Sequence, residues 1–510
     1  MAWLHSWVGL LAGWVLFFVF LTGTFGYVNV EVDRWMRPER PMPAAAPPPA
    51  ESLGLAERRL LDVAPEAESW VIVLPGGRGG ADLSVRWRAY PSNGKSGRET
   101  RENLDSRTGL PLQSIDRETG GGITLYVMHY ALHYLPAQWA YYIVGICTMF
   151  MLVAIMSGIV VHKKIFADFF TFRSGKGQRS WLDGHNLLAV TSLPFHLMIT
   201  WSGLLFFLFL YMPTAMEMLY PAGAARNAFI NDVYGIEPAG HSGTHAAAPM
   251  TPLTGLLPQV ERRWRAGAGI VEVTNPGRDT ARVTVYAHET GVSRIIPSLQ
   301  FDGVTGALLR ENEGGVAIPS AFISLLLGLH EGRFAEPLLR ALYVLAGLGG
   351  TAMIGAGLVL WSVKRKAKLP QEGRGSHVGI ALVDALNMAT ILGLPIAIAG
   401  YFWANRLLPV AMADRAAWEV NAMFMVWGLT FIYAAWRCRR GGWRDLSWLA
   451  AVAYGGLPLV NAATTGRHLA VSLPASDWAF AGFDLAALGI GLAFAALARA
   501  LGRRDRWAAR

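Results

Sequence analysis

Apolar runs long enough to cross a membrane recur along the whole chain of 510 residues. A membrane-spanning helix needs about 20 mostly apolar residues. The expected spans are 7–28, 138–161, 183–211, 339–361, 379–402, 418–436, 446–463 and 478–501. The first run lacks a charged segment before it and a prompt cleavage site after it, so we expect a retained span rather than a signal peptide. The pattern predicts a polytopic α-helical membrane protein with about eight spans.

Two segments between the spans instead mix helical periodicity with short alternating runs, which is typical of small α+β domains. They cover residues 54–125 and 213–335, and a Pro/Ala-rich tract at 31–53 is predicted to be an extended linker. The Asp-x-x-Thr-Gly sequences near the end of each segment suit turns and need no catalytic role. The remaining parts are the first span 1–30, spans two and three with a basic loop 126–212, span four 336–365, and a four-span extension 366–510.

Charge sets the expected orientation. The basic residues gather in short loops after spans two, four, six and eight, and cytoplasmic loops carry such an excess. This predicts a multi-pass protein of the bacterial inner membrane with both termini cytoplasmic and both α+β domains outside. The net charge of +9 is explained by these loops, so we expect contact with membrane lipid and with no nucleic acid.

The two cysteines, Cys147 and Cys438, are too few to hold an iron–sulfur cluster.

The first four spans form an internal duplication. Residues 4–24 match 184–204, which aligns His5 with His185 at an offset of 180. The Leu-His pairs that precede spans two and four align His133 with His330. Each half therefore reads as a span, an α+β domain and a second span in the same orientation, which is a parallel repeat.

A two-fold axis along the membrane normal would bring His5 toward His185 and His133 toward His330. Two imidazoles that approach from opposite sides are typical of bis-histidine haem iron. The duplication therefore predicts an inner and an outer haem site.

Two further histidines lack a histidine at the matching position of the repeat. His196 aligns with Leu16, and His162 aligns with Trp361. On a straight helix His185 and His196 would share one face, about 16 Å apart along the axis. Each membrane side then has three candidates for two ligand positions, and histidines at span ends also occur simply as interfacial residues. His129 is expected to be a less suitable ligand than His133, because Pro136 suggests that the next helix starts there.

Other chemistry finds little support in the sequence. No Gly-x-Gly-x-x-Gly follows a strand, no phosphate-binding loop is present, and His185-Asn186 does not start a His-Glu-x-x-His zinc motif. The sequence identifies no catalytic residue.

An ordered set of short motifs carries a resemblance over about residues 1–370. The motifs are LHSWVGL, LHYLP, SGIVVHKKIFADFFTFR, LDGHN and LH-x-G, together with the two Asp-x-x-Thr-Gly turns. The chain resembles the PepSY-associated transmembrane family, also called iron-regulated inner-membrane proteins. The resemblance implies PepSY-like outer domains, two b-type haems and reduction of ferric siderophores or other ferric chelates outside the membrane. The implied haem ligands come from His5, His133, His185, His196, His330 and His162.

This reading predicts a haem-dependent oxidoreductase for iron uptake. Its electron donor would be a separate cytoplasmic flavin or NAD(P)H-linked system, or a quinol, because no reductase domain is fused to the chain. The extension 366–510 has no counterpart in the compact family pattern. Two alternatives belong to other classes: a non-enzymatic membrane regulator whose outer domains bind a partner, and a transporter whose pathway lies between the repeats.

Overall fold

The structure is a computed structural model, and it separates the chain into two compact units. It describes residues 2–40, 47–76, 83–91, 97–112, 117–161, 173, 175–220, 228, 246–264, 267–288, 291–312, 318–367, 374–437 and 441–508. The first unit comprises Met1–Glu39, Arg117–Phe207 and Ala335–Arg510, and the second comprises Arg40–Asp116 and Leu208–Phe334.

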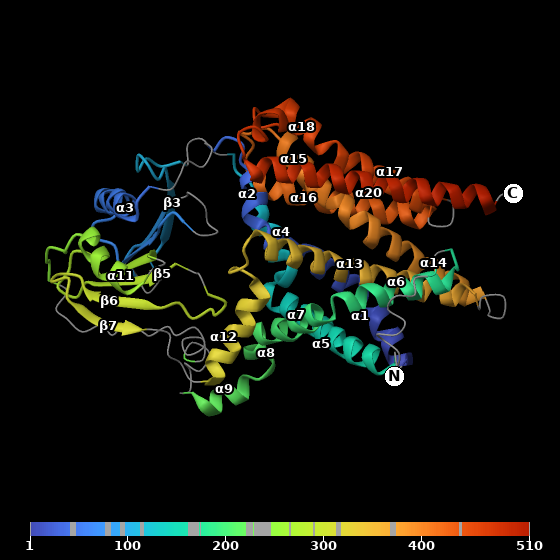
Figure 1. Ribbon diagram of the computed structural model, residues 1–510, viewed down its shortest axis with the longest axis horizontal. Coiled ribbons are helices and arrows are strands. Elements are labelled where there is room, and N and C mark those ends of the chain that lie inside the picture. Colours follow the sequence, from blue (N-terminus) through green and yellow to red (C-terminus); the bar gives the residue numbers. More distant parts are fainter. Residues whose placement is uncertain are drawn as a thin grey trace. The chain divides into compact units, whose positions relative to one another are not determined.

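The first unit is helical (Figure 1). Before the C-terminal extension, the described helices of this unit are α1 (Ala2–Thr24), α2 (Asn29–Met36), α4 (Gly121–Ala131), α5 (Ala137–Val161), α6 (Gln178–Thr191), α7 (Leu193–Phe206) and α13 (Pro337–Lys366). The extension contains α14 (Arg374–Met388), a π-helical turn (Ala389–Gly393), α15 (Leu394–Leu407), α16 (Arg415–Arg437), α17 (Gly442–Gly455), α18 (Leu457–Thr464), α19 (Leu469–Ser472) and α20 (Trp478–Ala508).

The chain is a multi-pass membrane protein. Among the described residues, 6 helices are long and apolar enough to cross a membrane, or up to 7 when the bent pair α6 and α7 counts as one span. These helices match every predicted span except the sixth, 418–436. That segment is helical, within α16, but Glu419 and Asn421 lower its mean hydropathy. The prediction of eight spans is thus confirmed in part.

The predicted third span is not one straight helix. α6 and α7 meet at Ser192 with a bend of 70°. Pro194 lies in the first turn of α7, where its missing N–H and its ring prevent continuation of the preceding helix. The rise of about 16 Å between His185 and His196, which assumed a straight helix, is therefore wrong.

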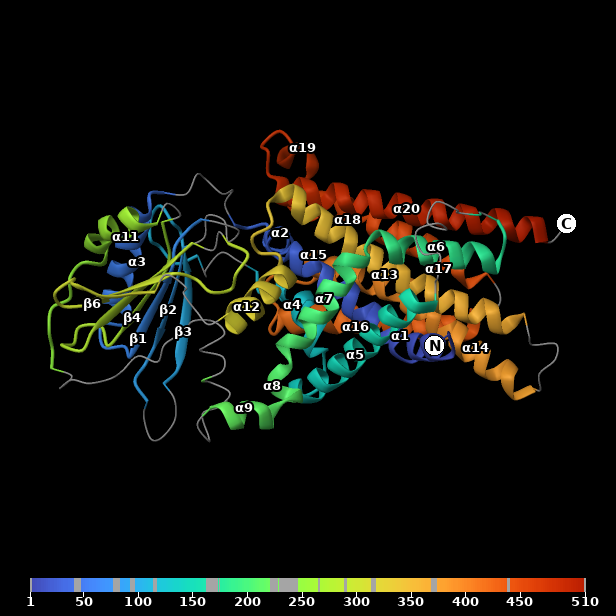
Figure 2. The ribbon, with the colours of Figure 1, turned by 60° about the horizontal axis from the view of Figure 1, so that its bottom comes forward.

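The second unit is built on one antiparallel sheet of seven strands in the order β3-β2-β1-β4-β5-β6-β7. The strands are β1 (Ser69–Val73), β2 (Leu83–Arg88), β3 (Glu99–Leu104), β4 (Ala268–Thr274), β5 (Arg282–Ala287), β6 (Ser298–Asp302) and β7 (Leu308–Asn312). β1 pairs with β4, Val71 opposite Glu272, so strands of both predicted α+β segments share one sheet. Figure 2 shows β4, β1, β2 and β3 side by side.

Alternating residues of this sheet bury its core, which includes Trp70, Ile72, Val271 and Phe301. The helices of the unit are α3 (Pro49–Val63), α8 (Leu208–Tyr211), α9 (Pro213–Leu219), α11 (Leu257–Arg263) and α12 (Ile318–Glu331), with a 3₁₀ turn at Leu253–Leu256. Leu53 and Leu60 of α3 belong to the same core.

The predicted linker 31–53 is wrong at both ends. α2 extends to Met36, because Trp35 and Met36 are fully buried in the core of the first unit. α3 already begins at Pro49, where the fixed φ of proline suits the first helical turn.

The Asp-x-x-Thr-Gly turns are structural, as predicted. Asp302 Oδ1 accepts hydrogen bonds from the N–H groups of Val304 and Thr305, and Asp105 Oδ1 accepts them from Arg107 and Thr108. The bond from the Thr305 N–H is the main cause that lowers the pKa of Asp302.

An Asp302→Ala variant is expected to lower the free energy of unfolding by about 1 kcal/mol at neutral pH. Because the folded pKa is depressed, this stabilisation is present above the unfolded pKa of about 4 and is lost as pH falls through the folded pKa. Thermal unfolding of wild type and variant at pH 7 and pH 3 measures the difference. An equal difference at both pH values would contradict the role of the charge, and Asp302→Asn serves as the uncharged control.

Candidate functional site

His5 of α1 and His185 of α6 face each other, as the repeat predicts. Their ring centroids are 6.3 Å apart and their planes differ by 76°. A metal ion bound by two opposite imidazoles needs about 2 Å for each metal–nitrogen bond, which places the ring centres about 6 Å apart. The distance between these two rings therefore matches a shared metal ion.

A backbone carbonyl fixes each of these rings. His5 Nδ1 lies 2.9 Å from the carbonyl oxygen of Ala154 in α5, and His185 Nδ1 lies 2.8 Å from that of Met353 in α13. Because a carbonyl only accepts, Nδ1 is the donor in both rings and Nε2 carries the free lone pair. Metal-bound histidines show this same arrangement.

A glycine follows each of these carbonyls by four residues and lies against the same ring. A Cβ atom at Gly158 would lie 3.4 Å from His5, and one at Gly357 would lie 3.2 Å from His185. Positions four apart lie on one face of a helix. Each imidazole therefore rests on a helix surface that has no side chain at the point of contact.

Two further histidines also meet a carbonyl and a glycine four residues later, His129 through Nδ1 and His196 through Nε2. His129 Nδ1 of α4 lies 2.7 Å from the Val19 carbonyl oxygen of α1, and a Cβ at Gly23 would lie 2.4 Å from that ring nitrogen. His196 Nε2 of α7 lies 3.2 Å from the Ala346 carbonyl oxygen of α13, and a Cβ at Gly350 would lie 2.8 Å from it. In all four cases the glycine comes four residues after the carbonyl.

His129 and His196 meet the same turn of α1. His129 contacts Val19 and Gly23, and the ring of His196 lies 5.9 Å from that of Phe20, edge to face. Both histidines therefore lie against the C-terminal half of α1, whereas His5 lies near its N-terminal end.

The depths of His185 and His196 can be compared on α13. Its two facing glycines, Gly350 and Gly357, are seven residues apart, which corresponds to about 10 Å of helix rise. This value replaces the one expected for a straight helix between His185 and His196.

The other predicted ligands are placed differently. His133 follows the end of α4, and its ring stacks on Phe424 of α16 with centroids 5.5 Å apart. Among the residues that the structure describes, it makes neither the carbonyl bond nor the glycine contact of His5, His129, His185 and His196. His330 lies in α12 of the second unit, so its predicted pairing with His133 stays a prediction. His162 is outside the described residues.

The sequence predicts His133 as a better ligand than His129, whereas in the structure His129 is the one that contacts a carbonyl and a glycine of α1. α4 ends at Ala131, so the two histidines do not continue on one helix. The signal available in the sequence was the presence of glycines within predicted spans, namely Gly23, Gly158, Gly350 and Gly357. Their contacts with histidines become visible only in the structure.

These residues fit a planar iron cofactor with polar groups at its edge. Four imidazoles in apolar surroundings suit haem iron, and the glycine contacts leave helix faces flat. Two buried donors near these histidines lack a hydrogen-bond partner among the described residues: Trp361 Nε1, one turn from Gly357, and Thr200 Oγ1, one turn from His196. Within the same described part of the chain, no cluster of three or more His, Cys, Asp and Glu residues forms another metal site.

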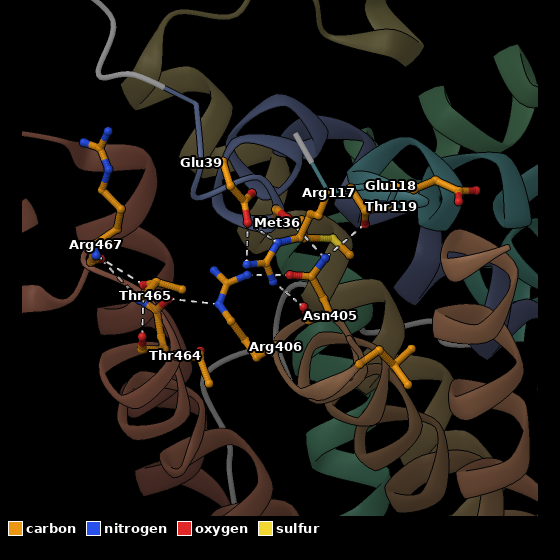
Figure 3. A network of polar contacts seen from close by, with 12 residues as sticks. Met36, Glu39, Arg117, Glu118, Thr119, Asn405, Arg406, Thr464, Thr465 and Arg467 are labelled. Carbon is orange, nitrogen blue, oxygen red and sulfur yellow. Dashed lines mark hydrogen bonds and ion pairs between the residues drawn. The ribbon is translucent and has the colours of Figure 1, made fainter. Parts of the chain in front are cut away.

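A buried polar network joins the extension to α2 and α4. Arg117 and Arg406 each donate a hydrogen bond to Asn405 (Figure 3). Arg415 and Glu419 form an ion pair in which both side chains are 0% exposed. Glu419 Oε2 also accepts hydrogen bonds from the Thr119 hydroxyl at 2.6 Å and the Gly120 N–H at 3.1 Å, immediately before α4. The network therefore fixes the start of the helix that carries His129.

A helical unit in which His5 and His185 face each other, and a separate unit with an antiparallel sheet, define a class of multi-pass membrane protein. The chain belongs to the family of the PepSY-associated TM region, whose model matches residues 2–364. The resemblance inferred from the motifs is thereby confirmed. No curated protein matches the chain. The family match ends within α13, so α14 to α20 lie beyond it.

A Gly23→Ala variant is expected to displace His129, because the new methyl group would lie 2.4 Å from Nδ1, which is also bonded to Val19. We expect loss of the cofactor at His129. Gly9→Ala on the same helix is the control, since a Cβ at Gly9 meets nothing within 4 Å. Haem content of both purified variants measures the effect, and full content in Gly23→Ala would contradict the role of this contact.

Proposed function

We propose that this protein transfers electrons across the membrane through two b-type haems. His5 and His185 would hold the inner one, and His129 and His196 the outer one. The observation that carries the proposal is the spacing of His5 and His185, 6.3 Å between ring centres, with each Nδ1 engaged by a carbonyl. Bound haem would supply a one-electron couple whose potential depends on burial and hydrogen bonding.

The residues of the chain prepare the site in three ways. The carbonyls of Ala154 and Met353 fix the tautomer and the orientation of the two inner imidazoles, which raises the basicity of Nε2. The glycines let a planar group approach the helices. The helices and the surrounding membrane would limit access of water, which would weaken competing ligands and protect a reduced centre from side reactions.

The acceptor and the direction of transfer follow from the family resemblance and the charge of the loops. Reduction would occur outside the membrane, on an Fe(III)-siderophore or other ferric chelate. The donor would be cytoplasmic, either a flavin or NAD(P)H-linked system or a quinol, in a bacterial inner membrane with both termini inside. The regulator and the transporter remain alternatives, and neither predicts a bound haem.

An optical spectrum of the purified protein tests the proposal. We expect a reduced-minus-oxidised spectrum of low-spin b-type haem and about two haems per chain by pyridine haemochrome assay. Reoxidation of the reduced protein by a ferric siderophore then tests the acceptor. Colourless protein from haem-replete cells would refute haem binding, whereas two haems that do not react with ferric chelates would refute only the substrate.

A further inference from the structure

One face of α13 continues beyond the histidine contact. Met353 and Gly357 serve His185, and the next positions on the same four-residue spacing are Trp361 and Arg365. Residues four apart on a helix lie one above the other. The face that holds the inner imidazole therefore leads, over two further turns, to an indole and then to a guanidinium.

The indole of Trp361 has an unused donor. Its Nε1 is buried and has no hydrogen-bond partner among the described residues. A buried N–H without an acceptor costs free energy, so such groups are rare in folded proteins and call for an explanation. An acceptor supplied by a bound group would satisfy it.

The guanidinium of Arg365 is held beside this donor. Its carbon atom lies 5.2 Å from the ring centre of Trp361 and 5.1 Å from that of Trp7 in α1, and the two indoles pack against each other at 5.7 Å. The cation is thus fixed by aromatic faces from both halves of the repeat. Among the described residues no carboxylate pairs with Arg365, whereas the adjacent Lys366 pairs with Asp384.

We propose that Trp361 and Arg365 form a subsite for a carboxylate of the inner cofactor, a propionate of the haem between His5 and His185. This inference rests on the proposed function. The indole N–H and the guanidinium would both donate to one carboxylate, which is the acceptor that a fixed guanidinium recognises best. Trp7 would orient Arg365 without binding the ligand itself.

The subsite affects the reduction potential. A propionate charge stabilises the ferric form, and its pairing with Arg365 and the Trp361 N–H offsets that effect. Loss of either donor is therefore expected to lower the midpoint potential of the inner haem. For Arg365→Gln we expect about a tenfold change in the reduction equilibrium, which is 59 mV for a one-electron couple.

Spectroelectrochemical titration of the full-length protein in nanodiscs tests this. Trp361→Phe and Arg365→Gln should each lower one of the two midpoint potentials and leave the other unchanged. Trp448→Phe is the matched control: Trp448 lies against another guanidinium, that of Arg499 at 5.7 Å from the ring centre, and is not part of the subsite, so both potentials should stay unchanged. Unchanged potentials in Trp361→Phe and Arg365→Gln, with two haems still bound, overturn the subsite and leave the proposed function intact.

Reconstitution of the apoprotein with haem dimethyl ester separates the two possible sources of the anion. Esterified propionates cannot accept the same charge-assisted hydrogen bond, so wild type and Trp361→Phe, which removes only an uncharged donor, should then have equal potentials. If Trp361→Phe still lowers the potential with the ester, the acceptor is another anion such as a lipid phosphate and the propionate assignment is wrong. A wild-type protein that binds no haem refutes the proposed function itself.

Discussion

A His185→Ala variant is expected to bind about one haem per chain instead of two, and to lose electron transfer across the membrane. His185 supplies one of two opposed imidazoles, and His5 alone cannot replace it. Partners in the second coordination shell are already worth about 10-fold to 100-fold in metal affinity, so loss of a ligand should cost more. The pyridine haemochrome assay measures the stoichiometry, and dithionite-reduced spectra show which haem remains.

His133→Ala is the matched control for this variant. His133 stacks on Phe424 and lacks the carbonyl and glycine contacts, so its loss should leave both haems bound. His129→Ala should instead remove the other haem and leave the one held by His5 and His185. If His185→Ala retains two haems, the assignment of the inner site is wrong. If His133→Ala loses one haem and His129→Ala keeps both, then His133 is the ligand of the outer haem, as the sequence predicts, and His129 is not.

The repeat made the inner pair predictable. His5 and His185 align at an offset of 180, and a parallel duplication brings equivalent positions to opposite sides of one axis. The proposed outer ligands, His129 and His196, could not be inferred in this way, because His196 aligns with Leu16 and His129 has no histidine at its matching position. It depends on how α1 and α13 pack against α4 and α7, which is tertiary information.

Two other features, the bend at Ser192 and the single sheet shared by both α+β segments, could not be predicted from the sequence for physical reasons. The bend at Ser192 was indicated by Pro194, yet a proline in a membrane helix causes anything from a slight kink to a break. The joined sheet depends on the pairing of β1 with β4, which lie about 200 residues apart in sequence. Strand patterns predict where strands occur but not which edges pair.

The extension contributes a buried ion pair that its sequence did not reveal. Arg415 and Glu419 are four apart at the start of α16, a spacing that on its own usually means a solvated pair. Here the side chain of Asn405 and the backbone before α4 complete the contacts of Glu419. A pair with both side chains fully buried is costly to break, because one charge is left without compensation.

A Glu419→Leu variant is therefore expected to lose about 3–5 kcal/mol of unfolding free energy, since it leaves Arg415 uncompensated. Thermal unfolding in detergent measures the loss. Glu99→Ala is the control for removal of a carboxylate: Glu99 pairs with Arg88 while both side chains are about half exposed, and exposed pairs contribute about 0–1 kcal/mol.

The double variant Arg415→Met with Glu419→Leu distinguishes two effects: the cost of an uncompensated buried charge, and the loss of the hydrogen bonds that Glu419 accepts before α4. Removing both charges should recover most of the lost stability, because no buried charge remains alone. It should not restore the hydrogen bonds from Thr119 and Gly120, which reach Glu419 directly before α4. We therefore expect a double variant with near-normal unfolding but reduced haem content at the pair that includes His129, and with the haem between His5 and His185 retained. Equal loss of both haems would show that the network stabilises the bundle as a whole and does not specifically position α4.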